Sequence, residues 1–150
     1  RQNWYNLTMK DIRIVSHEGE PNPTDMKTLV DGLLSHHASM GHPRNPKKFS
    51  LLLKDKNDVV LGGIIVCFLW NGMEITSLWV DKKLRNQGWG KKLIMAVEKE
   101  AVKRGCAFAY TNTFSWQAPE FYTKLGYALY GKLDDFPEGN SLGYYCKKLK

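Results

Sequence analysis

Residues 85–91 read RNQGWGK, a stretch in which two glycines flank a tryptophan and basic residues stand at both ends. A helical pattern follows it directly. The first amides of a helix have no partner inside the helix, and the helix dipole places partial positive charge at that end. Glycines permit positive φ and a close approach of the backbone, while Arg85 and Lys91 add full charges. This combination suits the binding of an anion such as a pyrophosphate.

Two common phosphate-binding motifs do not occur in this stretch. A Walker A loop would read GxxxxGK[ST], and a dinucleotide fingerprint would read GxGxxG, but Leu93 stands where the third glycine of the fingerprint is needed. Glycines at alternate positions also fit an ordinary turn between a strand and a helix. From spacing alone, both interpretations of residues 85–91 stay open.

The charge of the chain is unevenly distributed. The 150 residues are 43% hydrophobic, enough for one globular domain with a core, and carry a formal net charge of +7. Residues 81–104 hold eight basic against three acidic side chains, whereas residues 131–140 hold one basic against three acidic. The distribution suits one anionic and one cationic ligand, and solvated charged faces explain it equally well.

The apolar runs and the cysteines bear on the cellular compartment. The longest apolar run, residues 61–70, is too short to cross a bilayer, and no signal-peptide pattern opens the sequence. Cys67, Cys106 and Cys146 are widely spaced and form no CxxC pair. This predicts free thiols in a reducing compartment and no metal site. We therefore expect a cytoplasmic protein.

The hydrophobic periodicity predicts strands and helices in a mixed order. Helical spacing indicates helices between Thr24 and Gly41, from Gly88 to Arg104, and over 116–126. Strands are predicted at 10–16, 49–55, 58–70, 73–80, 106–114, 127–133 and 141–149, with Asn71 and Gly72 as a two-residue turn. This order favours an α/β fold, with a mixed central sheet of about six to seven strands flanked by helices. Residues 10–150 then form one domain, and residues 1–9 an N-terminal extension.

Two stretches carry a family resemblance. Residues 85–90, after a predicted strand, resemble the acetyl-CoA-binding signature R/Q-x-x-G-x-G/A of the GNAT family of N-acetyltransferases. SWQAPEFYTKLGY, residues 115–127, resembles the family's second signature N-x-x-A-x-x-x-Y-x-K-x-G-F/Y, with Ser115 in place of the asparagine. Residues 131–140 are similar to the D-x-P-x-G-H tail of a small bacterial subset, with Asn140 in place of the histidine. The resemblance covers roughly residues 10–150 and implies a single-domain GNAT-like fold.

The resemblance implies a site for acetyl-CoA as cosubstrate. The backbones of Leu78 and Val80 would pair with the pantetheine arm, and Ser115 would contact that arm as the asparagine does, with a shorter reach. The pyrophosphate would lie on the loop residues Arg85, Asn86, Gln87, Gly88, Trp89, Gly90 and Lys91. The helical spacing of Trp89 with Leu93, Val97 and Ala101 also predicts that the tryptophan side chain packs in the core.

Tyr122 and Glu74 are the candidate catalytic residues. The resemblance implies that Tyr122 is the general acid that protonates the leaving thiolate, and a phenol suits that step. A ring that only packs beside Phe121 is the alternative. Glu74 is the candidate base, and simple strand alternation would place it on one face with Leu78 and Val80. An exposed carboxylate at a strand end is the alternative for Glu74.

The resemblance implies an N-acetyltransferase that transfers acetyl to a primary amine by direct attack in a ternary complex. Neither signature contains a cysteine for a covalent acetyl-enzyme. Asp134, Asp135 and Glu138 either attract a small cationic acceptor or are solvated turn residues. A homodimer is a further expectation. Two other functions stay open: a basic module that binds nucleic acid through residues 81–104, and a CoA-binding sensor with this fold.

Overall fold

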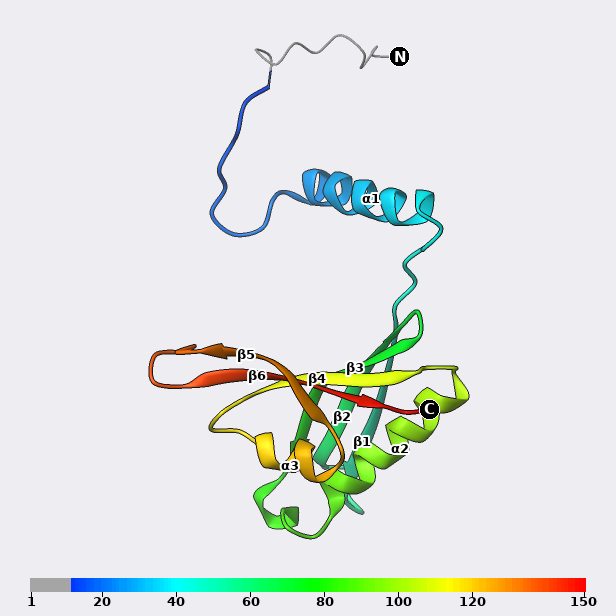
Figure 1. The fold of residues 1–150 in the computed structure, drawn as a ribbon, viewed down its shortest axis with the longest axis vertical. Coiled ribbons are helices and arrows are strands. Elements are labelled where there is room, and N and C mark those ends of the chain that lie inside the picture. Colours follow the sequence, from blue (N-terminus) through cyan, green and yellow to red (C-terminus); the bar gives the residue numbers. More distant parts are fainter. Residues whose placement is uncertain (1–11) are drawn as a thin grey trace. The chain divides into compact units, whose positions relative to one another are not determined.

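One mixed β-sheet organises the structure, a computed structural model that describes residues 12–150. The sheet order is β1-β2-β3-β4-β6-β5, and all neighbouring strands are antiparallel except β3 and β4 (Figure 1). The strands are β1 (Lys47–Lys54), β2 (Val60–Leu69), β3 (Gly72–Val80), β4 (Phe108–Phe114), β5 (Ala128–Asp134) and β6 (Ser141–Lys148). The predicted mixed sheet flanked by helices is confirmed, with six strands among the described residues.

The chain divides into two compact units, residues 1–43 and 44–150. In the described part of the first unit, helix α1 (Pro23–Ser39) begins after Asn22, whose side chain accepts hydrogen bonds from the amides of Thr24 and Asp25 at 3.1 and 3.0 Å. Asn22, two residues before Thr24, is therefore the N-cap of the helix predicted between Thr24 and Gly41. Asn22 can cap because its short side chain reaches the two orphan amides of the first turn.

The strand predicted over 10–16 is wrong for residues 12–16, which have no regular structure; residues 10 and 11 lie outside the described part. Ile12, Ile14 and Val15 are exposed. Alternation of apolar residues favours an extended chain, but a strand also needs a partner edge for its backbone hydrogen bonds. The sequence pattern of residues 10–16 does not supply such an edge.

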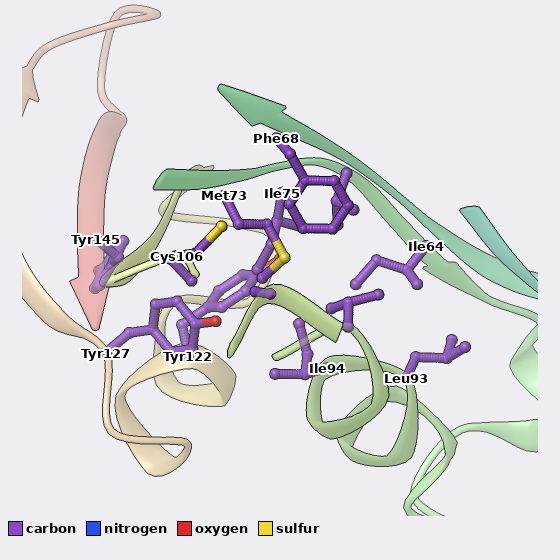
Figure 2. Packing of buried hydrophobic residues seen from close by; sticks show 14 residues of the cluster. Ile64, Phe68, Met73, Ile75, Leu93, Ile94, Cys106, Tyr122, Tyr127 and Tyr145 are labelled. Atoms are coloured by element: carbon purple, nitrogen blue, oxygen red, sulfur yellow. The ribbon is translucent and has the colours of Figure 1, made fainter. Parts of the chain in front are cut away.

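Two helices of the second unit cover the same face of the sheet. They are α2 (Trp89–Lys103), preceded by a short 3₁₀ turn η3 (Lys82–Leu84), and α3 (Pro119–Lys124). The apolar stripe of α2, residues Leu93, Ile94, Val97 and Ala101, is buried against the sheet. Figure 2 shows the cluster that results, in which side chains of α2, α3 and the strands interdigitate.

A partly buried polar network joins α2 to the β6–β5 end of the sheet. The Tyr127 hydroxyl donates to Glu98 Oε1 at 2.9 Å, and the Lys147 ammonium donates to both Glu98 oxygens at 2.9 and 2.8 Å. Burial, followed by the Glu98 charge, raises the pKa of the Tyr127 phenol far above its ordinary value. The network therefore holds a neutral tyrosine, a carboxylate and an ammonium between α2, the start of β5 and β6.

The turn between β2 and β3 lies one residue earlier than predicted. Leu69 pairs with Gly72, so Trp70 and Asn71 form the turn, and Trp70 has φ of 50°. Gly72 is the first residue of β3, where an added Cβ would lie 2.9 Å from the Phe108 ring. The glycine is needed for the close contact between β3 and β4 rather than for the turn.

The cysteines and the lengths of the helices can be compared with the sequence predictions. All three cysteines are free thiols, and Cys106 is buried. Within residues 12–150, every helix is too short or too polar to cross a bilayer. In the same part of the chain, no group of three or more His, Cys, Asp or Glu side chains could hold a metal ion.

Candidate active site

The central feature of the site is a split in the sheet between β3 and β4. These parallel strands pair only over three positions, from Gly72–Phe108 to Glu74–Tyr110. Beyond Glu74 they diverge, because β3 continues to pair with β2 while β4 continues to pair with β6. A groove of about 1160 Å³ fills the split, and it is lined by β3, β4, the loop before α2, and α3.

One wall of this groove is an open backbone edge. On the side away from the split, the Asp81 amide donates to the Leu61 carbonyl of β2 at 2.8 Å. Backbone groups alternate in direction along a strand, so Leu78 and Val80 present theirs toward the split. The Val80 carbonyl there accepts a hydrogen bond from Arg85 Nε at 3.0 Å. An extended amide chain could pair with this edge as an added strand.

A β-bulge in β3 decides which side chains face the core. Ile65 pairs with Ser77 and Val66 pairs with Ile75, so Thr76 is an extra residue. The extra residue reverses the alternation: Ile75, Leu78 and Val80 all pack against the core cluster. The prediction that Glu74 shares a face with Leu78 and Val80 is therefore wrong, because sequence alternation does not reveal an inserted residue.

The loop between β3 and α2 lines the groove next to the carboxyl end of β3. Asn86 and Gly88 have φ of 60° and 79°, and Gly88 is the residue that precedes the first turn of the helix. The first turn of α2 has no side-chain cap and no acidic residue. Its amides are therefore available to an anion, with Arg85 and Lys91 beside them in the groove lining.

The two glycines of the loop have different roles. Gly88 adopts a left-handed conformation with nothing near its missing Cβ, so its backbone freedom is what matters. At Gly90, an added Cβ would lie 3.2 Å from the ring of Phe121. Gly90 therefore lets α2 pack closely against α3, which the sequence did not indicate.

Trp89 was predicted to pack in the core, but it lies outside the core cluster. It is half-buried and lines the groove, with the Lys92 ammonium 4.2 Å above its ring. Because Trp89 is the first residue of the helix, its side chain projects from the open end of the apolar stripe rather than into the packed part.

Tyr122 lies at the junction of the core and the groove. Its ring contacts those of Phe121, Tyr127 and Tyr145 at centroid distances of 5.2, 5.6 and 6.3 Å. Figure 2 labels Tyr122, Tyr127 and Tyr145 in the same buried cluster. It also lines the groove. Burial raises the pKa of its phenol, and a hydrogen bond with Thr111 opposes that shift. The hydroxyl is therefore protonated at neutral pH, which is the form a proton donor needs.

Ser115 is placed away from the groove. Its hydroxyl donates to Asn140 Oδ1 at 3.2 Å and accepts from the Ser141 amide at 3.2 Å. Ser115 and Asn140 are the two positions at which the sequence departs from the motifs it resembles, and they bond to each other. The predicted contact of Ser115 with a ligand arm is thus not supported, because its short side chain is engaged at the start of β6.

Gln117 lines the groove instead, and sequence reasoning missed it. Its Oε1 accepts from the Phe114 amide at 3.0 Å and from Thr113 Oγ1 at 3.2 Å. The Phe114 amide can only donate, so the oxygen of Gln117 must face it and the NH₂ group must point elsewhere. The side chain therefore brings a fixed amide donor to the groove wall.

The acidic candidates lie in two different settings. Glu74 is half-buried at the point where β3 and β4 separate, and it lies outside the groove lining. The pKa of the Tyr110 phenol is raised, first by burial and second by the negative charge of Glu74. Asp134 pairs with Lys132, and Asp135 accepts from the Gly139 amide at 2.7 Å. Most of the acidic loop is thus engaged in the turn itself.

Of the loop residues 85–91 that were predicted to hold the pyrophosphate, Gln87 is the one that does not line the groove. Its side-chain amide donates to the Lys83 carbonyl at 2.8 Å, which ties the loop to η3. The other predicted cosubstrate residues line the groove: Leu78, Val80, Arg85, Asn86, Gly88, Trp89, Gly90 and Lys91.

Comparisons with known proteins agree with this architecture. A crystal structure of an acetyltransferase from Bacillus cereus superposes with a TM-score of 0.80 at 28% identity, over 89% of this chain and 97% of that one. A blasticidin-S acetyltransferase from Streptomyces morookaense is 34% identical over 59% of the chain, and an L-ornithine N5-acetyltransferase from Arabidopsis thaliana is 30% identical over 55%. The chain spans 65% and 40% of the length of these two proteins. The profile of the acetyltransferase (GNAT) family matches residues 6–127, and the chain belongs to that family.

Proposed function

We propose that this protein is an acetyl-CoA-dependent N-acetyltransferase that acts on the primary amine of a small cationic molecule. The observation that carries the proposal is the groove at the β3–β4 split, which joins the uncapped start of α2 to the buried hydroxyl-bearing ring of Tyr122. A long ligand with an anionic end and a reactive end matches such a groove.

The acetyl donor binds along the groove in this proposal. Its pyrophosphate lies on the amides of residues 85–91, and its pantetheine arm pairs with the backbones of Leu78 and Val80. Gln117 supplies the side-chain amide contact that Ser115 cannot make. Thr113 and Phe114 hold its oxygen, so its NH₂ group is the part of the side chain that can donate to a ligand in the groove. An anionic cosubstrate also accounts for the basic residues of this loop without nucleic acid.

The chemistry is direct transfer in a ternary complex. The neutral amine attacks the carbonyl carbon of the thioester, and a tetrahedral intermediate forms. When the carbon–sulfur bond breaks, the Tyr122 hydroxyl donates its proton to the sulfur, so CoA leaves as a thiol. The nitrogen loses one proton and becomes the acetamide. The raised Tyr122 pKa keeps the donor protonated at the pH of the reaction.

Glu74 receives the proton of the amine through water in this scheme. It stands where the strands part, on the face of the sheet opposite to α2 and α3, so an acceptor on that face would meet it. The names of two relatives, which specify blasticidin-S and L-ornithine, support an amine carried by a small molecule. A cytoplasmic location and a homodimer stay predictions.

Isothermal titration with acetyl-CoA tests donor binding. We expect micromolar affinity for the wild type, and a loss of at least about tenfold in Lys91→Glu, because the substitution puts a negative charge beside the pyrophosphate. Lys99→Glu is the matched control: it changes the net charge equally on an exposed position of the same helix, and we expect less than about a twofold effect. No binding by the wild type would overturn the proposal.

A second titration tests the role of Gln117. In Gln117→Glu, the carboxylate can still accept from Thr113 and Phe114, but the amide donor is lost and a negative charge is added. We expect acetyl-CoA to bind about tenfold more weakly, since an acceptor would then face the carbonyl of the ligand arm. Ser115→Ala should change the affinity by less than about twofold. The reverse order of effects would return the contact to Ser115.

A further inference from the structure

An exposed aromatic cluster adjoins the groove where β4 ends, across the split from the basic loop that follows β3. The rings of Phe114 and Trp116 stack with centroids 4.4 Å apart and an interplanar angle of 11°. The ring of Phe136, from the loop between β5 and β6, lies 6.1 Å from that of Phe114. Phe114 and Trp116 line the groove, yet Trp116 is 55% exposed and Phe136 is 51% exposed. Three large rings together in contact with water form the kind of patch that binds a ligand.

The cluster faces the side of the sheet on which an acceptor would approach. Along β4, Ala109, Thr111 and Thr113 are buried toward α2 and α3. Phe114 therefore points to the opposite face, together with Tyr110 and Asn112. Tyr110 is the register partner of Glu74 at the point where β3 and β4 separate. The aromatic rings and the candidate base thus share one face of the sheet.

The loop that carries Phe136 is acidic and internally braced. The Phe136 amide donates to the Asn140 carbonyl at 3.1 Å, the Asn140 amide donates to the Pro137 carbonyl at 2.8 Å, and Asp135 accepts from the Gly139 amide. The Ser115–Asn140 bond ties the loop to the end of β4, beside Trp116. Because Lys132 pairs with Asp134, the net charge of −2 over residues 131–140 comes from Asp135 and Glu138.

We infer that this cluster and loop recognise a planar cation on the acceptor, such as a guanidinium group, in a molecule that also carries the reacting primary amine. The inference rests on the proposed function and names the class of its acceptor. A flat cation can stack on an exposed indole and pair with a carboxylate at its edge, which a compact ammonium does less well. An aromatic platform beside the net negative charge of the β5–β6 loop therefore selects a guanidinium over an ammonium.

Three amines with the same four-methylene spacer test the inference with acetyl-CoA as donor. They are agmatine, which ends in a guanidinium; 1,4-diaminobutane, which ends in an ammonium; and 4-phenylbutylamine, which ends in an uncharged ring. For the wild type we expect kcat/KM for agmatine to exceed that for 1,4-diaminobutane by about tenfold, with 4-phenylbutylamine lowest. In Trp116→Ala the preference for agmatine should fall to about twofold, while the Kd of acetyl-CoA stays within about twofold.

The control variants separate the subsite from general damage. Trp70→Ala removes a tryptophan of equal exposure, 55%, in the β2–β3 turn outside the groove, and should keep the preference. Glu138→Gln, on an exposed loop, should lower kcat/KM for both cations about threefold relative to 4-phenylbutylamine, and it tests the inference even if Trp116→Ala does not fold.

Several outcomes would overturn the inference alone. Equal kcat/KM for the two cations in the wild type would do so, as would an unchanged agmatine preference in Trp116→Ala. Weaker acetyl-CoA binding with a retained preference would assign the rings to the donor. If none of the amines turns over, agmatine and 1,4-diaminobutane are titrated into the CoA-saturated protein. Equal Kd values for the two cations would then reject the inference. Failure of acetyl-CoA to bind is a different result and rejects the proposed function.

Discussion

Replacement of Tyr122 by phenylalanine is expected to lower kcat by about 100-fold and to leave the Kd of acetyl-CoA within about twofold. The ring of phenylalanine keeps the contacts with Phe121, Tyr127 and Tyr145, so the core stays packed. The hydroxyl is lost, and the thiolate must then leave without a proton donor. Steady-state kinetics that follow thiol release, together with titration of acetyl-CoA, measure the two quantities.

The pH dependence of the wild type gives an independent check on this role. Burial raises the Tyr122 pKa above the ordinary tyrosine value of about 10. The donor is therefore fully protonated through the neutral range, and kcat limited by it should decline only as the pH rises above about 10. This decline of kcat at high pH should be absent in Tyr122→Phe. Tyr130→Phe, at an exposed position of β5 outside the groove, is the matched control and should behave as the wild type.

An unchanged kcat in Tyr122→Phe would remove the acid assignment and leave the fold and the donor site as they are. A wild type that binds acetyl-CoA with the expected affinity but acetylates none of a broad panel of amines would favour the sensor instead. The two experiments therefore distinguish a wrong residue from a wrong function.

Replacement of Glu98 by alanine is expected to lower the free energy of unfolding by about 3 kcal/mol. The side chain of Glu98 is 13% exposed and that of Lys147 is 26% exposed. Removing the carboxylate leaves the Lys147 ammonium and the Tyr127 hydroxyl without their shared partner in a poorly hydrated place. Urea denaturation followed by circular dichroism measures the loss.

The pair Glu120–Lys124 on α3 provides the control for this prediction. It is also a carboxylate–lysine pair, but the Glu120 side chain is 85% exposed. Glu120→Ala should change the free energy of unfolding by less than about 1 kcal/mol, because water solvates both charges in either state. Equal losses in the two variants would mean that the Glu98 network contributes no more than a surface ion pair.

Local signals determined much of the loop on which we propose that the donor binds. The run of residues 85–91 predicted a loop before a helix, and the structure has the left-handed Gly88 and an uncapped α2 there. Pro119 and Gly126 likewise bracket the short α3, with Gly126 at φ of 88°. These features follow from sequence because each depends on the backbone freedom or periodicity of residues close together in the chain.

The tertiary structure alone decided which of these side chains meet. The bulge at Thr76 turned Glu74 away from the face of Leu78 and Val80, and no local pattern marks an inserted residue. The bond between Ser115 and Asn140 took Ser115 out of the groove.

The proposed acceptor subsite depends even more on long-range packing. Phe114 and Phe136 are 22 positions apart in the printed sequence, and their contact exists only because β6 pairs with β4 and brings the β5–β6 loop beside the end of β4. The types and spacing of residues thus determined most of the elements and the loop before α2. The divergence of two parallel strands, which arises from their separate partners β2 and β6, determined that a groove lies between them, with the basic loop after one strand and the aromatic rings after the other.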